Sequence, residues 1–374
     1  MTAIVNVTPN WGIGKDGRLL VSISEDLRRF RELTSDKPVV YGRKTMATFP
    51  GGKPLKNRLN LVLSTTTPEG DGYRVFSNVS ELLRYLTANG GWAGAQVIGG
   101  ETVYRELLPY CDKVELTRAL NDALPADAYF PDLDALPEWK LRWEGPVLTA
   151  REDPTQQFQY ATYVRPCPAV IFDLDGTLWN SVEQILPAWN RVVGEYGKTI
   201  TLEELYGFMG RTVEELAAMV LPELPAEEGA AVIDRCCREE LGDLRRSPGT
   251  LYPALRETLR ALAGKYRLMI VSNSQDGYVQ TFLDSCGLWD YFSDIEMYGR
   301  TGKSKAENIR LVLQRSGAEQ AVYVGDTESD ALAAAEAGVP FVYAAYGFGA
   351  VDGAAHRVET PAELEGILAE LLRD

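Results

Sequence analysis

The chain has 374 residues, 45% of them hydrophobic, and is longer than one ordinary domain. It has no run of about 18 apolar residues and no basic segment followed by an apolar one at its start, so we expect neither a membrane span nor a secretion signal. Its five cysteines lack the spacing of a metal site, which favours reduced thiols and a cytoplasmic location. His356 is the single histidine, which excludes multi-histidine zinc sites and leaves carboxylates, lysine, a cofactor or a hard metal for any chemistry.

The charges divide the chain into two unlike parts. Residues 1–165 carry 20 Lys and Arg against 20 Asp and Glu, whereas residues 166–374 carry 18 against 33 and account for the whole net charge of −15. This acidic excess argues against nucleic acid as a partner. An anionic substrate bound by the second part would need a cation to offset the repulsion.

Short apolar strands alternate with helical segments in both parts, a pattern typical of parallel sheets covered on both faces. Strands are predicted at 4–7, 38–41, 59–64, 96–98, 113–117, 158–164, 169–172, 268–271, 321–324 and 341–343. A short, stiff boundary between the two parts is predicted at Arg165-Pro166-Cys167-Pro168, because its two prolines prevent a helix or a strand from continuing through it. We therefore expect α/β domains at 1–165 and 166–374, the second with a helical insertion at about 182–250.

Residues 24–33 predict an amphipathic helix that carries a carboxylate on its apolar face. Ser24 is the expected N-cap. At about 100° per residue the apolar face consists of Leu27, Phe30 and Leu33. Asp26 projects onto this face, where a carboxylate is costly unless it has a task. Asp26 is therefore a candidate functional residue, and a first-turn acid that stabilises the helix dipole is the alternative.

Two strand-to-helix junctions carry features of phosphate binding. The first contains a glycine followed by two cations, in Gly42-Arg43-Lys44-Thr45. The second passes through Gly99-Gly100 into a helix, whose N-terminus favours an anion. Neither has the spacing of a Rossmann fingerprint, and each alone is a weak signal.

Several motifs together make the first half resemble dihydrofolate reductases. They occur in that family's order and spacing: Trp11-Gly12-Ile13-Gly14, Glu25-Asp26-Leu27, Gly42-Arg43-Lys44-Thr45, Leu55-Lys56-Asn57-Arg58, Ile98-Gly99-Gly100 and Tyr129-Phe130-Pro131. The resemblance implies that Asp26 fixes the pterin ring of dihydrofolate and supports protonation at its N5. Thr117 would brace this site, Phe30 would contact the substrate, and Arg58 would bind the α-carboxylate of its glutamate.

The same resemblance implies an NADPH site. Its residues would be Gly14, Arg43, Lys44, Thr45, Ser64, Thr65, Gly99 and Gly100. One departure is Leu20-Val21, where many relatives have Pro-Trp before the helix. Without that aromatic, we expect antifolate affinity and loop behaviour to differ from those of such relatives more than the reaction does. The related reductase of riboflavin synthesis is the nearest rival, and Asp26 together with Arg58 argues against it.

Carboxylates and hydroxyl groups follow the predicted strands of the second half. Asp173-Leu174-Asp175-Gly176-Thr177 follows the first strand, Ser272-Asn273 the second, and Asp326-Thr327-Glu328-Ser329-Asp330 the third. Ligands bind outside the carboxyl ends of strands in open α/β sheets. Asp173 and Asp175 would share one face if the strand stayed regular, and such a pair suits a hard divalent cation plus a nucleophile.

With Lys303-Ser304-Lys305, these stretches match in order the motifs of phosphatases of the haloacid dehalogenase superfamily, which the second half therefore resembles. The resemblance implies that Asp173 is a nucleophile that forms an aspartyl-phosphate and that Asp175 is the acid and base. Phosphoryl oxygens would be bound by Thr177, Ser272, Asn273 and a lysine, for which Lys305 is favoured over Lys303 because it begins the next helix. Mg²⁺ would be held by Asp173, Asp326, Asp330 and the backbone carbonyl of Asp175.

The two resemblances predict a bifunctional cytoplasmic α/β enzyme. A mixed, mostly parallel reductase sheet would precede a Rossmannoid parallel sheet with a helical cap, in which Arg211 either reaches the substrate or is solvated. The first domain would reduce 7,8-dihydrofolate with NADPH, and the second would hydrolyse a small phosphomonoester with Mg²⁺. The fusion favours a dihydropterin phosphate of folate synthesis as the substrate, and phosphoglycolate, a nucleotide and a sugar phosphate are the alternatives. A phosphomutase and a non-catalytic interaction module are the remaining alternatives.

Overall fold

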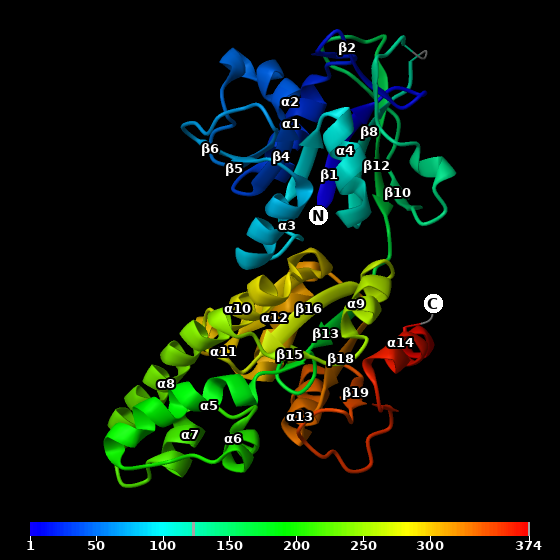
Figure 1. The fold of residues 1–374 in the computed structure, drawn as a ribbon. Coiled ribbons are helices and arrows are strands. Elements are labelled where there is room, and N and C mark those ends of the chain that lie inside the picture. The colour runs from blue at the N-terminus through cyan, green and yellow to red at the C-terminus, as the bar shows by residue number, and fades with distance from the viewer. Residues whose placement is uncertain (122–123, 373–374) are drawn as a thin grey trace. The chain divides into compact units, whose positions relative to one another are not determined.

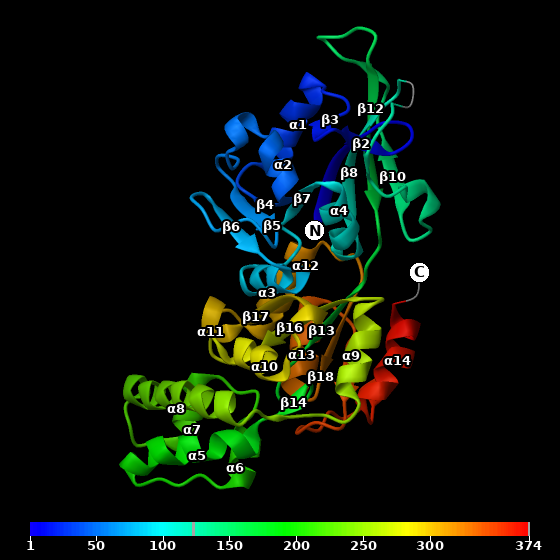
Figure 2. The same ribbon diagram turned by 45° about the horizontal axis from the view of Figure 1, so that its top comes forward.

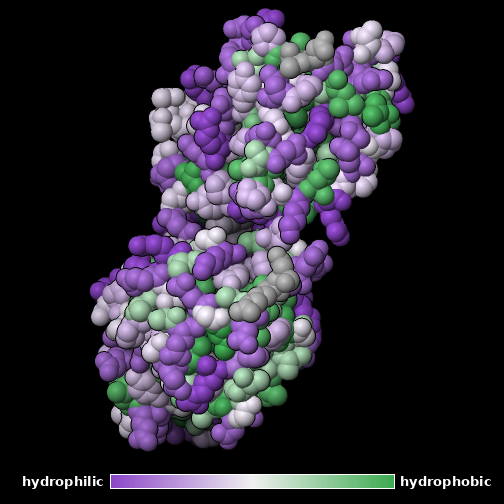
Figure 3. Space-filling view, turned by 90° about the vertical axis from the view of Figure 1, so that its right-hand side faces the viewer, coloured by the Kyte–Doolittle hydropathy of each residue, from purple (hydrophilic) through white to green (hydrophobic). Residues whose placement is uncertain are grey.

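The computed structural model describes residues 1–121 and 124–372 and contains two compact α/β units, Met1–Pro166 and Cys167–Asp374 (Figure 1). Each unit has its own sheet and its own hydrophobic core. The predicted fold class, two α/β domains with mostly parallel sheets, is confirmed. Among the described residues, no helix is both long and apolar enough to cross a membrane. Figure 3 shows hydrophilic side chains over most of the face that it presents, with apolar patches between them.

The sheet of the first unit has the strand order β10-β12-β8-β1-β7-β4-β5-β6, and β11 also pairs with β12. Neighbours from β8 to β6 are parallel, whereas β12 is antiparallel to β8, β10 and β11. The strands are β1 (Thr2–Val7), β4 (Pro38–Gly42), β5 (Leu59–Leu63), β6 (Tyr73–Phe76), β7 (Gln96–Gly99), β8 (Lys113–Ala119), β10 (Lys140–Glu144), β11 (Leu148–Thr149) and β12 (Gln157–Val164). A small sheet joins β3 (Arg18–Leu19), β2 (Gly12–Lys15) and β9 (Ala128–Tyr129).

Helices cover both faces of the first sheet (Figures 1 and 2). On one face, α3 (Val79–Ala88) and α4 (Glu101–Leu107) pack with Val40 and Val97. On the other, α1 (Ser24–Thr34) and α2 (Arg43–Thr48) pack with Val39 and Tyr41. Successive residues of a strand point to opposite faces, so a strand covered on both sides is apolar throughout.

The predicted helix at 24–33 forms as α1, but Ser24 is its first helical residue rather than its N-cap. The N-cap is Ile23, whose side chain makes no capping hydrogen bond. Ser24 Oγ donates instead to Glu25 Oε2 over 3.1 Å. Phe30 and Leu33 pack against the sheet, whereas Leu27 is 41% exposed, so the apolar face is only partly covered.

The second sheet is parallel throughout, in the order β17-β16-β13-β18-β19-β20. Its strands are β13 (Ala169–Phe172), β16 (Arg267–Ser272), β17 (Phe292–Met297), β18 (Ala321–Gly325), β19 (Phe341–Ala344) and β20 (Arg357–Val358). Apolar residues of α12 (Lys305–Ser316) and α13 (Glu328–Ala337) pack against the central strands. This order places β16 and β18 on either side of β13, so the carboxyl ends of these three strands meet at one edge.

A helical cap lies between β14 (Trp179–Asn180) and β15 (Thr250–Leu251), which pair antiparallel (Figure 2). Its helices are α5 (Val182–Val193), α6 (Leu202–Phe208), α7 (Val213–Val220) and α8 (Ala226–Arg246). Capping boxes begin α6 at Thr201 and α7 at Thr212. In each box the threonine side chain accepts a hydrogen bond from the backbone N–H of a glutamate, and that glutamate side chain accepts one from the backbone N–H of the threonine. The long helix α8 packs against both α5 and α7.

Candidate active sites

Asp26 lies at the junction of α1 with the central strands of the first sheet. Its Oδ1 accepts a hydrogen bond from Thr117 Oγ1 over 2.5 Å, and its Oδ2 accepts one from Asn6 Nδ2 over 3.2 Å. Asn6 of β1 and Thr117 of β8 are opposite each other in the parallel register, so both side chains face α1. Burial raises the pKa of Asp26, and the hydrogen bonds from Thr117 and Asn6 offset this only in part. Asp26 can therefore keep a proton at a higher pH than an exposed aspartate can.

Arg58 is held against the other end of the same helix. Its Nε and Nη2 donate to Thr34 Oγ1 over 3.1 and 3.0 Å, and its Nη1 donates to the carbonyl of Lys56 over 2.6 Å. Thr34 in turn donates to the carbonyl of Phe30 over 2.7 Å. Asp26, Phe30 and Arg58 thus lie along or at the end of one helix. The guanidinium is fixed in orientation but only half-buried, an arrangement in which it could bind a carboxylate.

The predicted cofactor residues gather at the carboxyl ends of β4, β5 and β7, with one exception. β4 and β7 are parallel neighbours with Tyr41 opposite Gly99. A Cβ on Gly99 or Gly100 would lie 3.5 or 3.3 Å from Thr45 Oγ1, so these turns approach each other closely. The remaining residues of this edge are the exposed Arg43, Lys44 and Thr65 and the half-buried Ser64. Gly14 lies instead in β2 of the small sheet.

This edge suits a phosphate-bearing cofactor. It combines exposed cations with hydroxyl groups and with glycine backbone that a phosphate could approach. Ser64 Oγ already accepts from the backbone N–H of Thr66 and Thr67 over 3.3 and 3.1 Å, so part of its role is to shape the turn after β5. The residues present therefore fit NADPH.

In the second unit, Asp173, Asp326 and Asp330 are buried at the carboxyl edge of the sheet, with carboxylate oxygens within 4.8 Å of one another. Lys305 Nζ donates to Asp173 Oδ1 over 2.8 Å and to Asp330 Oδ1 over 2.6 Å. Ser304 caps α12, which puts Lys305 in the first turn and buries it, whereas Lys303 is exposed. The structure therefore brings Lys305, not Lys303, into the cluster.

This cluster is short of positive charge. Three carboxylates face one ammonium group, and burial followed by Asp330 raises the pKa of Asp326 to about 7. Burial also raises the pKa of Asp173, with Lys305 opposing the shift. A Cβ on Gly176 or Gly347 would lie 2.1 or 2.3 Å from Asp326, so glycine backbone encloses these oxygens. Oxygen ligands with a deficit of charge fit Mg²⁺.

The carboxylate of Asp175 does not join this cluster. A shared face for Asp173 and Asp175 was expected only if the strand stayed regular, and it does not. β13 ends at Phe172, and the chain turns at Gly176, where φ is +86°. Three donors lie 2.9 Å from Asp175 Oδ1: Trp179 Nε1, Ser181 Oγ and Tyr278 Oη. Burial nevertheless raises the pKa of Asp175 to about 6, which suits proton transfer near neutral pH.

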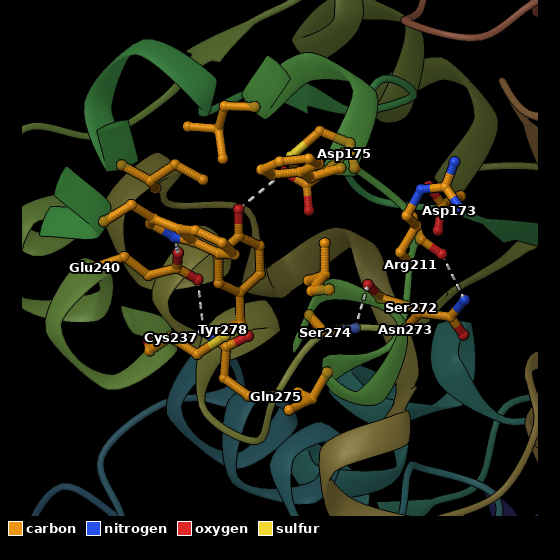
Figure 4. Close-up of a pocket in the computed structure, with 18 residues that line it drawn as sticks. Asp173, Asp175, Arg211, Cys237, Glu240, Ser272, Asn273, Ser274, Gln275 and Tyr278 are labelled. Atoms are coloured by element: carbon orange, nitrogen blue, oxygen red, sulfur yellow. Dashed lines mark hydrogen bonds between the residues drawn. The ribbon is translucent and has the colours of Figure 1, made fainter. Parts of the chain in front are cut away.

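Asp173 and Asp175 open into a cavity of about 80 Å³ between the core and the cap (Figure 4). Ser272 and Asn273 line its core side, and Asn273 Nδ2 donates to the carbonyl of Gly210 in the cap over 3.0 Å. Arg211 lines the cavity but is exposed, with its Nε donating to the carbonyl of Gly207 over 3.1 Å. Thr177 is buried, and its hydroxyl donates to Asp326 Oδ1 over 3.3 Å.

Known proteins match the two units separately. A family model described as dihydrofolate reductase matches residues 1–165, and one described as haloacid dehalogenase-like hydrolase matches residues 170–344. The dihydrofolate reductase of Bacillus subtilis is 35% identical over 129 residues, which cover 34% of this chain and 73% of that protein. Phosphoglycolate phosphatase (plasmid) of Cupriavidus necator is 31% identical over 207 residues, which cover 52% of this chain and 88% of that protein. The chain belongs to both families.

It is thus a dihydrofolate reductase fused to a haloacid dehalogenase-like hydrolase. A solved structure of dihydrofolate reductase from Enterococcus faecalis, complexed with NADP(H) and RAB-propyl, is 31% identical over 44% of this chain and 95% of that chain, with a TM-score of 0.39.

Sequence reasoning missed some residues of both sites. In the reductase part it missed Asn6, although a polar residue between Val5 and Val7 of an apolar strand was a visible signal. In the hydrolase part it missed Ser181 and Tyr278 beside Asp175, which only the folded chain brings together. It also missed the buried Glu240 of α8, which lies among the apolar residues of that helix.

Proposed function

We propose that the reductase part reduces 7,8-dihydrofolate to tetrahydrofolate with NADPH, which supplies the hydride when bound. The observation that carries this proposal is the half-buried Asp26, which accepts hydrogen bonds from Thr117 and Asn6 and whose pKa is raised by its partial removal from water. Asp26 holds the pterin ring and supports protonation at N5, which is general acid–base work. Arg58, fixed on Thr34, pairs with the α-carboxylate of the substrate.

Replacement of Arg58 by Ala is expected to raise the KM for dihydrofolate far more than the Kd for NADPH. A hydrogen bond to a charged group contributes about 1.5–3 kcal/mol, so the increase is about 10- to 150-fold. Steady-state kinetics and NADPH titration measure the two effects, with the exposed Arg28→Ala on α1 as the matched control. An equal effect on both ligands would contradict the proposed contact and favour a non-folate substrate.

We propose that the hydrolase part cleaves a small phosphomonoester with Mg²⁺, which neutralises phosphoryl charge when bound. The cluster of Asp173, Asp326, Asp330 and Lys305 supports this proposal. Asp173 Oδ attacks phosphorus and forms an aspartyl-phosphate while Asp175 gives its proton to the departing alcohol. Asp175 then takes a proton from water, which attacks the phosphorus and releases phosphate and the free Asp173.

For the substrate we propose a dihydropterin phosphate of folate synthesis, such as dihydroneopterin monophosphate. The support is the covalent fusion to a reductase of dihydrofolate, which keeps the two activities in equal amount. Phosphoglycolate is the alternative that the name of the Cupriavidus necator relative favours.

The test compares kcat/KM for dihydroneopterin monophosphate, phosphoglycolate, a nucleoside monophosphate and a sugar phosphate, with and without EDTA. We expect phosphate release that EDTA stops and Mg²⁺ restores, fastest with the pterin ester. A preference of tenfold or more for another ester, which is about 1.4 kcal/mol in transition-state binding, would contradict the pterin substrate alone. Absence of hydrolysis with every ester would favour an interaction module, and a requirement for a bisphosphate would favour a mutase.

A further inference from the structure

Glu240 is a buried carboxyl group in the cap that the proposed hydrolysis does not use. It lies on α8, is 3% exposed, and lines the cavity that also contains Asp173 and Asp175 (Figure 4). Trp189 Nε1 of α5 donates to its Oε2 over 2.5 Å, and Gln275 Nε2 of the core donates to its Oε1 over 2.7 Å. Gln275 also donates to the carbonyl of Cys237 over 2.9 Å, so it contacts α8 twice.

The partners of Glu240 make it a hydrogen-bond acceptor. Trp189 offers only a donor, and the amide nitrogen of Gln275 offers a donor as well. Burial nevertheless raises the pKa of Glu240 to about 8, so the two donors do not fully compensate for the loss of water. At neutral pH the group therefore keeps a proton on one oxygen, and a further donor from a bound molecule would favour the ionised carboxylate, as the two present donors do.

The rest of the cavity favours an alcohol without negative charge. Its cap side is mostly apolar, and its residues include Ile185, Leu205, Phe208, Met209, Val213 and Leu216. Among the described lining residues, the only lysine or arginine is Arg211, which is exposed to solvent. A substrate carboxylate placed at the cap side would lose water beside Glu240 and Asp175 without a buried cation to replace it.

We propose that Glu240 is a specificity-determining residue of the hydrolase part, which accepts a hydrogen bond from a hydroxyl or N–H group of the alcohol portion of the phosphomonoester. It thereby selects phosphomonoesters whose alcohol portion carries a further hydroxyl or N–H group. It disfavours those whose alcohol portion carries a carboxylate, phosphoglycolate included. This inference rests on the proposed phosphomonoesterase activity and narrows its substrate class.

Matched esters test the proposal with the full chain and Mg²⁺. Glycerol 3-phosphate and 3-phosphoglycerate differ by a hydroxymethyl group against a carboxylate, and so do 2-hydroxyethyl phosphate and phosphoglycolate. We expect the wild-type chain to prefer the hydroxyl member by tenfold or more in kcat/KM in at least one pair. Glu240→Leu should lower that ratio by tenfold or more, and Glu240→Gln, which keeps the side-chain size, should lower it in the same direction.

Two controls separate recognition from cap docking. Gln275→Leu removes the contact between Glu240 and the core but keeps the carboxyl group, so it should change the rates for all esters without reversing the preference. Glu228→Gln alters an exposed residue of α8, the helix that carries Glu240, and should change neither the rates nor the preference. A wild-type preference for the carboxylate esters, or an unchanged ratio in both Glu240 variants, would overturn the proposal while hydrolysis itself persists. Absence of hydrolysis with all four esters would instead overturn the phosphomonoesterase proposal and this inference with it.

Discussion

Replacement of Asp173 by Asn is expected to lower the kcat for phosphate release by about a thousandfold or more, with no change in dihydrofolate reduction. The amide keeps the size of the side chain but removes the nucleophilic oxygen. Lys305 retains its hydrogen bond to Asp330, so the buried ammonium stays paired and the hydrolase part should still fold. Loss of one of three clustered carboxylates also relieves repulsion.

Phosphate release and NADPH oxidation measured on the same preparation check this result. Asp234→Asn, an equivalent change at an exposed position of α8, is the matched control and should leave both rates unchanged. A phosphatase rate near wild type in the Asp173 variant would show that another group attacks the phosphorus.

Replacement of Asp26 by Asn is expected to lower the reductase kcat at neutral pH by about 10²- to 10⁴-fold, the usual contribution of a positioned acid or base. The amide oxygen can still accept from Thr117, so the structure around this residue should persist and NADPH binding should stay near normal. Because burial raises the pKa of Asp26, the wild-type rate should change as this group titrates above the range of an ordinary aspartate. That step should be absent from the pH profile of the variant.

Pre-steady-state hydride transfer across a pH series, together with NADPH titration, measures both effects. Glu32→Gln on the same helix is the control, because Glu32 is exposed and the ion pair given for it is with the exposed Arg28. If the Asp26 variant reduced dihydrofolate at the wild-type rate, the assigned role would be wrong.

Much of the fold could be predicted because its strands are short, apolar and bounded by turn residues. β17 was missed because its sequence includes Ser293, Asp294 and Glu296, all buried. Arg315 of α12 donates to Asp294 Oδ2 over 2.8 Å and to Glu296 Oε2 over 2.7 Å. A buried carboxylate is tolerated when it is paired in this way. The hydropathy pattern of the strand could not indicate this pairing, because Arg315 lies in a different element, the helix α12.

The residue types of the two sites were more predictable than their arrangement. The family motifs indicated Asp26, Asp173, Asp326, Asp330 and Lys305, and the structure places the last four in one cluster. The separate direction of the Asp175 carboxylate could not be predicted, because it depends on the turn at Gly176 and on donors as distant in sequence as Tyr278. Glu240 had one local signal, its place on the apolar face of α8, but its partners Trp189 and Gln275 come from elsewhere in the chain.

The central claim is that one chain contains two complete and chemically separate active sites. A two-channel assay tests it most directly: NADPH oxidation and phosphate release are recorded together from one mixture of dihydrofolate, NADPH, Mg²⁺ and a phosphomonoester. Asp26→Asn should lose NADPH oxidation and keep phosphate release, and Asp173→Asn should show the reverse. Loss of both signals in either variant, with the fold intact by circular dichroism, would contradict the claim.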